Sequence, residues 1–272
     1  MGLRDRAGGP GAIMADLPWT EAANRIRAGH PVVLPIGAAA KAHGPHLPLG
    51  TDAITVEALG RRLAEALPLL VAPTLGFGFY PAFVEFPASQ HIPARQFEDL
   101  LVTLMRGLID HGTSRLLMMN GGVSTEAPVT VASHVIYAET GVRPAMAHLR
   151  LFGRSADAVL DDASGGHADE RETSVMLALR PDLVDLAKAH PAPADPPAAK
   201  GTPSGARISQ PIRLANGRPP GPGEQSNEGA TGNPTLATAA KGAAILDATM
   251  ADLTTEIRRV FADAPGMLGE NG

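Results

Sequence analysis

Histidine and aspartate side chains gather in one short segment, residues 37–52, whose sequence is GAAAKAHGPHLPLGTD. Its two prolines fix φ and remove backbone donors, so the segment predicts a shaped loop rather than the interior of a helix or strand. Imidazole nitrogens and carboxylate oxygens are typical ligands of divalent metal ions such as zinc. His43 and Asp52 are therefore candidate metal ligands, and Lys41 is an unexpected cation among them.

A second cluster of polar residues follows at HADERE, residues 167–172. If a helix covers this segment, His167 and Glu170 lie three residues apart on one helix face, where they could join a metal site. Acidic residues also favour a helix N-terminus without any ligand, and single histidines are commonly structural. The spacing leaves both interpretations open.

Composition limits the kind of protein and the kind of site. The chain of 272 residues has a formal net charge of −5 and no long block of Lys or Arg, which argues against a nucleic-acid partner. No window approaches the run of roughly 18 apolar residues that a membrane span needs. The N-terminal segment lacks the apolar stretch of a secretion signal, so we expect a cytoplasmic location. Because the chain has no cysteine, any metal must be held by His and carboxylate side chains.

Short apolar runs alternate with amphipathic segments, which predicts strands alternating with helices. The expected strands span residues 31–37, 69–75, 114–122 and 143–152, and the expected helices span 53–67, 94–112, 126–140, 166–184 and 233–263. This alternation is typical of an α/β fold with a mostly parallel sheet and helices on both faces. The loops that follow strands, at 37–52, 76–90 and 120–125, should then gather at one edge of the sheet.

Two polar residues mark expected helix starts. Asp52 is in position to cap helix 53–67, because its carboxylate can accept a hydrogen bond from the first turn. Asn233, followed by Pro234, is in position to cap the C-terminal helix.

The distribution of Gly and Pro predicts the domain organisation. We expect a flexible N-terminal arm over residues 1–15 and a single α/β domain over residues 16–265. A Pro- and Gly-rich excursion at 190–232 is expected within this domain, either mobile or wrapped over a neighbouring subunit.

Three longer motifs carry a resemblance to a known family. The segment PIGAAAKAHGPHLPLGTDA is similar to the pattern P-x-G-S-x-E-Q-H-G-P-H-L-P-L-G-T-D. The segment HADERETSVMLALRPDLV is similar to H-A-G-E-x-E-T-S-x-M-L-A-L-R-P, and TGNPTLATAAKG is similar to G-D-P-x-x-A-T-A-E-K-G. These patterns, in this order, are those of the creatininase (creatinine amidohydrolase) family. The chain resembles that family over residues 20 to 262.

The resemblance implies a single three-layer α/β/α domain with a mostly parallel sheet, often assembled as hexamers. It also implies hydrolysis of a C–N bond in a small amide or cyclic amide at a divalent metal centre, with Zn, Mn or Fe as the ion. Such centres are commonly binuclear, with an aspartate that bridges two ions. The metal's role is to activate water and to polarise the scissile carbonyl.

The family's site residues carry over unevenly. By resemblance, His43 matches a histidine ligand, Asp52 the bridging aspartate and Glu170 a glutamate of the metal site. His167 matches a histidine that is a candidate for orienting substrate or moving a proton. Lys41, however, stands where the family has its first glutamate ligand.

A second departure is Gly122, which stands in LLMMNGGVS where the family has the histidine of N-G-H. Two of the three ligands of one ion are thus missing, whereas His43, Asp52 and Glu170 would hold the other. Lys41 then either replaces the missing cation beside Asp52 or turns to solvent. We favour replacement, and expect at most one divalent ion, with the Lys41 ammonium within salt-bridge reach of Asp52.

The loop after strand 69–75 is rich in aromatic residues, among them Tyr80 and Phe83. It predicts either an apolar wall over the site or a contact between subunits. Phe83 stands at a position where the family often has histidine.

Three functions remain open, in order of preference. The first is an amidohydrolase with one divalent ion, in which Lys41, His167 and Glu170 are the candidate catalytic residues. The second is a metal-free enzyme that uses Lys41 as an acid, a base or a Schiff-base former. The third is a non-catalytic relative that acts as a binding or assembly subunit. A homo-oligomer is expected in each case from the resemblance.

Overall fold

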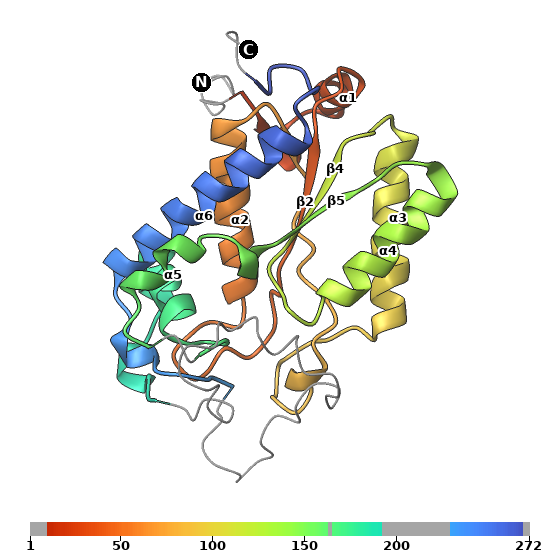
Figure 1. Ribbon diagram of the computed structural model, residues 1–272. Coiled ribbons are helices and arrows are strands. Elements are labelled where there is room, and N and C mark those ends of the chain that lie inside the picture. Colours follow the sequence, from red (N-terminus) through yellow and green to blue (C-terminus); the bar gives the residue numbers. More distant parts are fainter. Residues whose placement is uncertain (1–9, 163–164, 192–228, 269–272) are drawn as a thin grey trace, which may run out of the picture.

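A parallel β-sheet forms the centre of the computed structural model, which describes residues 10–162, 165–191 and 229–268 (Figure 1). The strand order is β1-β3-β2-β4-β5, and every described strand pair is parallel. The strands are β1 (Ala12–Ile13), β2 (Val32–Ile36), β3 (Leu70–Val71), β4 (Leu116–Asn120) and β5 (Ala145–His148). The predicted α/β class with a mostly parallel sheet is confirmed.

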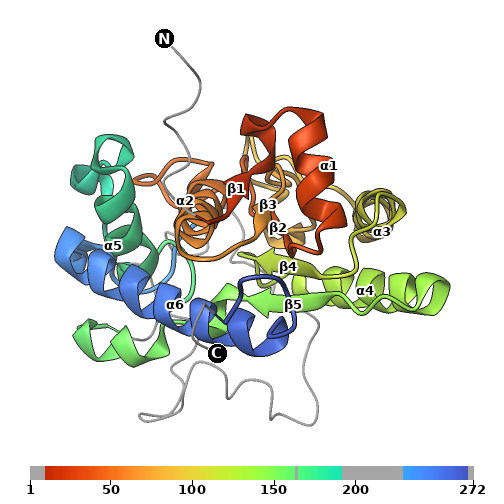
Figure 2. The same ribbon diagram turned by 90° about the horizontal axis from the view of Figure 1, so that it is seen from above.

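Helices cover both faces of this sheet. They are α1 (Trp19–Arg27), α2 (Thr51–Ala66), α3 (Ala94–Asp110), α4 (Glu126–Thr140), α5 (Glu170–Leu179) and α6 (Ala239–Val260). Helices α2, α5 and α6 lie on one side, and α1, α3 and α4 lie on the other (Figure 2). The three-layer α/β/α architecture is therefore confirmed. No helix among the described residues is long and apolar enough to cross a membrane.

The alternation of side chains along the strands explains the two apolar layers. On β2, Val33 packs in the cluster with α2 and α6, whereas Val32 and Leu34 pack in the cluster with α3 and α4. On β4, Leu117 and Met118 divide between the two layers in the same way. Because successive strand residues point to opposite faces, continuous apolar runs are needed when both faces are covered.

The connections place a crevice at the carboxyl ends of β2 and β4. These two strands are neighbours in the sheet. The chain leaves β2 towards α2 on one face and leaves β4 towards α4 on the other (Figure 1). Such a divergence is the position at which open α/β sheets bind ligands.

Two predicted helix caps differ from the structure. Helix α2 begins at Thr51, so Asp52 lies inside its first turn, and no side chain caps it. Asn233 caps a short 3-10 turn, whereas the hydroxyl of Thr238 caps α6 by accepting a hydrogen bond from the backbone N–H of Lys241. Both predictions were wrong because the helices begin elsewhere, α2 at Thr51 rather than at 53 and α6 at Ala239 rather than at 233.

Part of the predicted N-terminal arm belongs to the sheet instead. Residues 12–13 form β1, whose partners in the sheet are Leu70 and Val71. Gly11 permits this pairing, because a side chain at that position would overlap the carbonyl oxygen of Leu67. Residues 1–9 and most of the predicted excursion at 190–232 lie outside the described residues.

Candidate active site

A small pocket opens at the carboxyl ends of the central strands, where the topology predicts a ligand site. Its lining includes Lys41 and Asp52 from the β2–α2 region, Gly78 and Tyr80 from the loop after β3, and Gly122 and Thr125 from the β4–α4 loop. The predicted meeting of these three loops is confirmed. The close approach of His43 and His167, described below, brings the segment before α5 to the same place.

Lys41 and Asp52 form a buried ion pair in this pocket. The Lys41 Nζ lies 2.6 Å from the Asp52 Oδ2, and each residue is only 7% exposed. The prediction that Lys41 would reach Asp52 is confirmed, and the alternative that it turns to solvent is wrong. Burial alone would raise the pKa of Asp52, but the Lys41 ammonium and the His43 ring outweigh it and hold the pKa well below its usual value.

His43 is fully buried between two hydrogen-bond acceptors. Its Nδ1 lies 2.8 Å from the carbonyl oxygen of Lys41, and its Nε2 lies 3.0 Å from the Oδ1 of Asp52. A carbonyl and a carboxylate both accept, so the single N–H of a neutral ring can satisfy only one of the two contacts. Either both nitrogens carry protons, or a metal ion lies on the Nε2 side while Nδ1–H donates to the carbonyl. The second arrangement is typical of metal-binding histidines.

His167 has a matching arrangement on the other side of the site. Its Nε2–H donates to the carbonyl oxygen of Ala42 at 2.7 Å, which leaves the Nδ1 lone pair free. The Nδ1 lies 3.7 Å from the Oε2 of Glu172. Burial, followed by the charges of His43 and Lys41, lowers the pKa of His167 well below its ordinary value. The ring is therefore neutral near pH 7, which is the form that binds a metal or accepts a proton.

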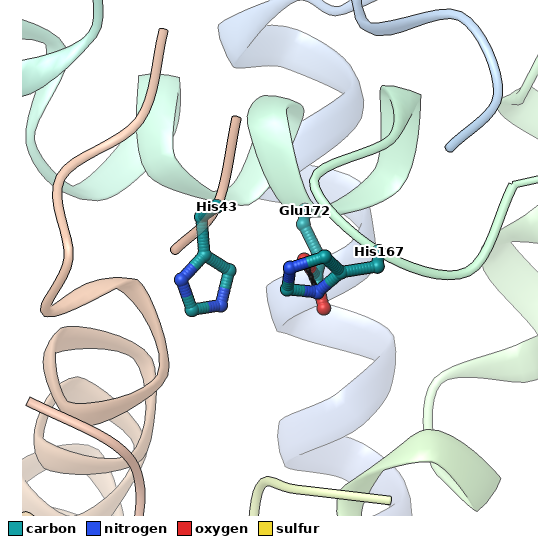
Figure 3. Close-up of side chains that lie close together, drawn as sticks. All are labelled: His43, His167 and Glu172. Atoms are coloured by element: carbon teal, nitrogen blue, oxygen red, sulfur yellow. Dashed lines mark ion pairs between the residues drawn. The ribbon is translucent and has the colours of Figure 1, made fainter. Parts of the chain in front are cut away.

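These side chains form the candidate metal centre. Ligand atoms of His43, His167 and Glu172 all lie within 4.8 Å of one another (Figure 3). The backbone before α5 supports this geometry, since Ala168 has a φ of 48°, in a region that non-glycine residues seldom adopt. Its N–H donates to the Glu172 carboxylate at 2.6 Å, which orients that side chain. The donors present fit one divalent ion.

Glu170 lies outside this group of donors. Its carboxylate is fully buried and accepts hydrogen bonds from Lys241 and from the backbone N–H groups of Asp161 and Asp162. Its assignment as a metal ligand and catalytic residue stays a prediction that the structure does not test. The shared face expected for His167 and Glu170 is absent, because α5 begins only at Glu170.

Sequence reasoning missed Glu172. Glu172 belongs to the polar segment HADERE, but Glu170 matches the glutamate of the family pattern. The metal-ligand role was therefore assigned to Glu170. Two residues apart on a helix correspond to about 200° of rotation, so Glu170 and Glu172 point to different sides of α5. Only the position of α5 against its neighbours decides which carboxylate meets the histidines.

Gly122 lines the pocket together with Lys41 and Asp52 and contributes no side chain to it. A Cβ atom at Gly122 would lie 2.7 Å from the Thr125 Oγ1, so a larger residue needs a change at Thr125. Thr125 donates a hydrogen bond to the Oδ1 of Asn120 at 2.6 Å, which fixes the turn after β4. The described part of the chain thus supplies no second ligand where the family pattern has histidine.

Phe83 packs over the site, in agreement with the prediction that its loop forms an apolar wall there. Its ring centroid lies 4.5 Å from that of His167 and 5.3 Å from the Nζ of Lys41.

His46 lies in the same loop as His43, but its Nε2 pairs with the hydroxyl of Thr173 at 2.9 Å. It does not belong to the group of donor atoms.

The family profile described as "Creatininase: Creatinine amidohydrolase" matches residues 15–257 of this chain. The chain belongs to the creatininase family. This membership confirms the resemblance inferred from the three sequence motifs.

Individual relatives agree with this membership. The chain is 30% identical over 249 residues to the mycofactocin precursor peptide peptidase of Mycobacterium tuberculosis, covering 87% of this chain and 88% of the relative. It is 29% identical over 215 residues to the creatinine amidohydrolase of Pseudomonas putida, covering 68% and 79%.

Solved structures of creatininase share the fold. A manganese form is matched with a TM-score of 0.77 at 23% identity, covering 94% of this chain and 99% of that chain. A Zn–Zn form of a creatininase variant is matched with a TM-score of 0.78 at 24% identity, covering 93% and 98%.

Proposed function

We propose that this chain is an amidohydrolase that cleaves a C–N bond of a small amide or cyclic amide with the help of one divalent metal ion. His43, His167 and Glu172 supply the donors, and Asp52 is the fourth, 3.0 Å from the His43 ring nitrogen. The observation that carries the proposal is the paired orientation of the histidines. Each is tied by one nitrogen to a backbone carbonyl and directs the other at a carboxylate.

The protein side chains supply binding, orientation and charge. Neutral His167 presents its Nδ1 lone pair, while the Lys41 ammonium lines the pocket and can attract a carbonyl oxygen. Phe83 covers both groups and limits access of water to them. When bound, a divalent ion lowers the pKa of a water molecule and polarises a carbonyl group. Amide hydrolysis needs these properties together.

The substrate class follows from the relatives and the site. One relative is named as a peptide peptidase and another as a creatinine amidohydrolase, and both names denote hydrolysis of an amide-type C–N bond. The pocket is small and partly apolar, with Ile36, Leu75 and Phe77 in its lining. A small amide or the end of a peptide fits these dimensions better than a large folded substrate.

Metal-dependent hydrolysis is the test of this proposal. The purified protein is freed of metal with a chelator, reloaded with Zn, Mn or Fe, and assayed with creatinine, N-formyl amines and short peptides. We expect hydrolysis of at least one class only after reloading. The variant His43→Gln should lose metal binding, whereas His46→Gln, a neighbouring buried histidine outside the donor group, should retain it.

Two alternatives predict other results. Full hydrolysis by the metal-free protein would overturn the proposed metal dependence. Trapping of Lys41 by borohydride with a carbonyl substrate would then support the Schiff-base alternative, which draws on the position of Lys41 in the pocket lining. Metal binding without hydrolysis of any class would instead favour a non-catalytic subunit.

Assembly and location belong to the same proposal. We propose a homo-oligomer, on the basis of the family resemblance, located in the cytoplasm. Sedimentation of the full chain at working concentration tests the first expectation, and a monomer would contradict it.

A further inference from the structure

The carboxylate of Asp52 faces two cation positions, one on each oxygen. Its Oδ2 lies 2.6 Å from the Nζ of Lys41, and its Oδ1 lies 3.0 Å from the Nε2 of His43. Both Lys41 and Asp52 are more than nine-tenths buried, so water does little to weaken these contacts. A buried carboxylate in this position can pair with one positive charge at each of its two oxygens.

We propose that the ammonium of Lys41 takes the place of a second metal ion, so that Asp52 joins one divalent ion on the His43 side to one protein cation. This inference rests on the proposed function, because it needs the ion held by His43, His167 and Glu172. It goes further in giving the physical reason why the site takes one ion and not two. It also gives Lys41 the role of a protein cation that a chelator cannot remove.

The Lys41 side of Asp52 lacks a ligand set for a second ion among the described residues that line the pocket. Gly122 has no side chain to offer there. Apart from Asp52, the lining offers only the neutral hydroxyl groups of Tyr80, Ser124 and Thr125, whereas protein zinc sites use His, Cys and carboxylate ligands. A divalent ion at this position would also be repelled by the ammonium beside it.

Phe83 holds the ammonium in place. The Nζ of Lys41 lies 5.3 Å from the centroid of the Phe83 ring, a distance at which a cation is attracted to an aromatic face. The same ring contacts His167, so one side chain covers both the protein cation and the candidate metal centre. An ammonium held by a carboxylate and an aromatic ring does not leave easily to admit an ion.

Metal stoichiometry tests the inference. The unmutated protein is saturated with Zn, separated from free metal by dialysis, and analysed by elemental analysis. We expect one ion per chain. Two tightly held ions in the unmutated protein would overturn the inference while leaving the proposed hydrolysis intact. This measurement does not depend on the folding of any variant.

A variant that rebuilds the second half-site gives the positive test. It combines Lys41→Glu and Gly122→His with Thr125→Ala, because a Cβ at Gly122 would press on the Thr125 hydroxyl. We expect its stoichiometry to rise from about one towards two, with an unchanged far-ultraviolet circular dichroism spectrum. A folded variant that still holds one ion would contradict the role assigned to Lys41.

The matched control keeps Lys41 and carries only Gly122→His with Thr125→Ala. We expect one ion, because the added imidazole faces the ammonium. Two ions in this control would overturn the inference, since the ammonium would then not exclude the second ion. If the unmutated protein holds one ion but hydrolyses none of the tested amides, the proposed function is contradicted and the inference on Lys41 is not.

Discussion

The imidazole rings of His43 and His167 lie 4.6 Å apart, although one follows strand β2 and the other precedes helix α5. Each ring is fixed by a hydrogen bond to a backbone carbonyl of the segment 41–42. The same short loop thus sets the orientation of both histidines. This relationship makes the site sensitive to small changes in the loop and in the start of α5.

Glu172 and Glu170 provide a matched pair of carboxylates on one helix. We expect Glu172→Gln to weaken metal binding by at least about 10–100-fold, because it removes a charged donor from the group with His43 and His167. Glu170→Gln should leave metal affinity nearly unchanged and lower stability, because Glu170 pairs with Lys241. Calorimetric titration with Zn and urea unfolding measure the two effects. The opposite result would support the predicted assignment of Glu170 as a metal ligand.

Removal of the Lys41 charge should destabilise the metal-free protein. Lys41→Met leaves the buried carboxylate of Asp52 without its ammonium partner, which costs about 3–5 kcal/mol in comparable buried pairs. Lys188→Met removes an exposed pair with Asp185 and should have a near-neutral effect. Urea unfolding of both variants, in the presence of a chelator, compares the free energies of unfolding. Equal effects would contradict a structural role for the buried pair.

His46 should make stability fall in mild acid. Burial, with a smaller effect from His190, lowers the pKa of His46 from 6.5 to about 4. Between these values the unfolded chain binds a proton that the folded chain does not, so the free energy of unfolding decreases as the pH falls through this window. The loss attributable to His46 is at most about 3 kcal/mol.

The variant His46→Gln isolates this contribution. Glutamine keeps a donor for the Thr173 hydroxyl but does not titrate. We therefore expect urea unfolding of the variant between pH 4 and 6.5 to show a shallower dependence on pH than that of the unmutated protein. Identical pH dependence in the two proteins would rule out His46 as the titrating group.

Two helical glycines should respond in opposite ways to the same substitution. Gly242 on α6 faces α5, and a Cβ there would overlap the carbonyl oxygen of Ser174. Gly242→Ala should therefore destabilise the protein by about 1–3 kcal/mol or more. Gly107 on α3 has open space around it, so Gly107→Ala should stabilise it by about 0.5–1 kcal/mol. Thermal unfolding of both variants measures the difference, and a stabilising effect of Gly242→Ala would disprove the close α5–α6 contact.

Local sequence was sufficient to predict the scaffold, the meeting of its loops at one edge and the Lys41–Asp52 pair. Apolar runs such as that in β2 can be buried on both faces only in a covered parallel sheet, so the fold class followed from pattern alone. In a parallel sheet, the loop that follows β2 lies at the carboxyl edge, where such sheets bind ligands. The pairing of Lys41 with Asp52 was also predictable, because the residues lie in one loop and a buried carboxylate requires a partner.

Only the tertiary structure decided which groups complete the site. The sequence motif favoured Glu170 over Glu172, yet Lys241 and the backbone near residue 161 bind the Glu170 carboxylate. Asp52 resembled a helix cap, but the partners contributed by the preceding loop turn its carboxylate elsewhere. These outcomes depend on where a helix begins and how it is rotated against its neighbours. A shift of two residues turns a side chain by about 200° and would exchange Glu170 for Glu172.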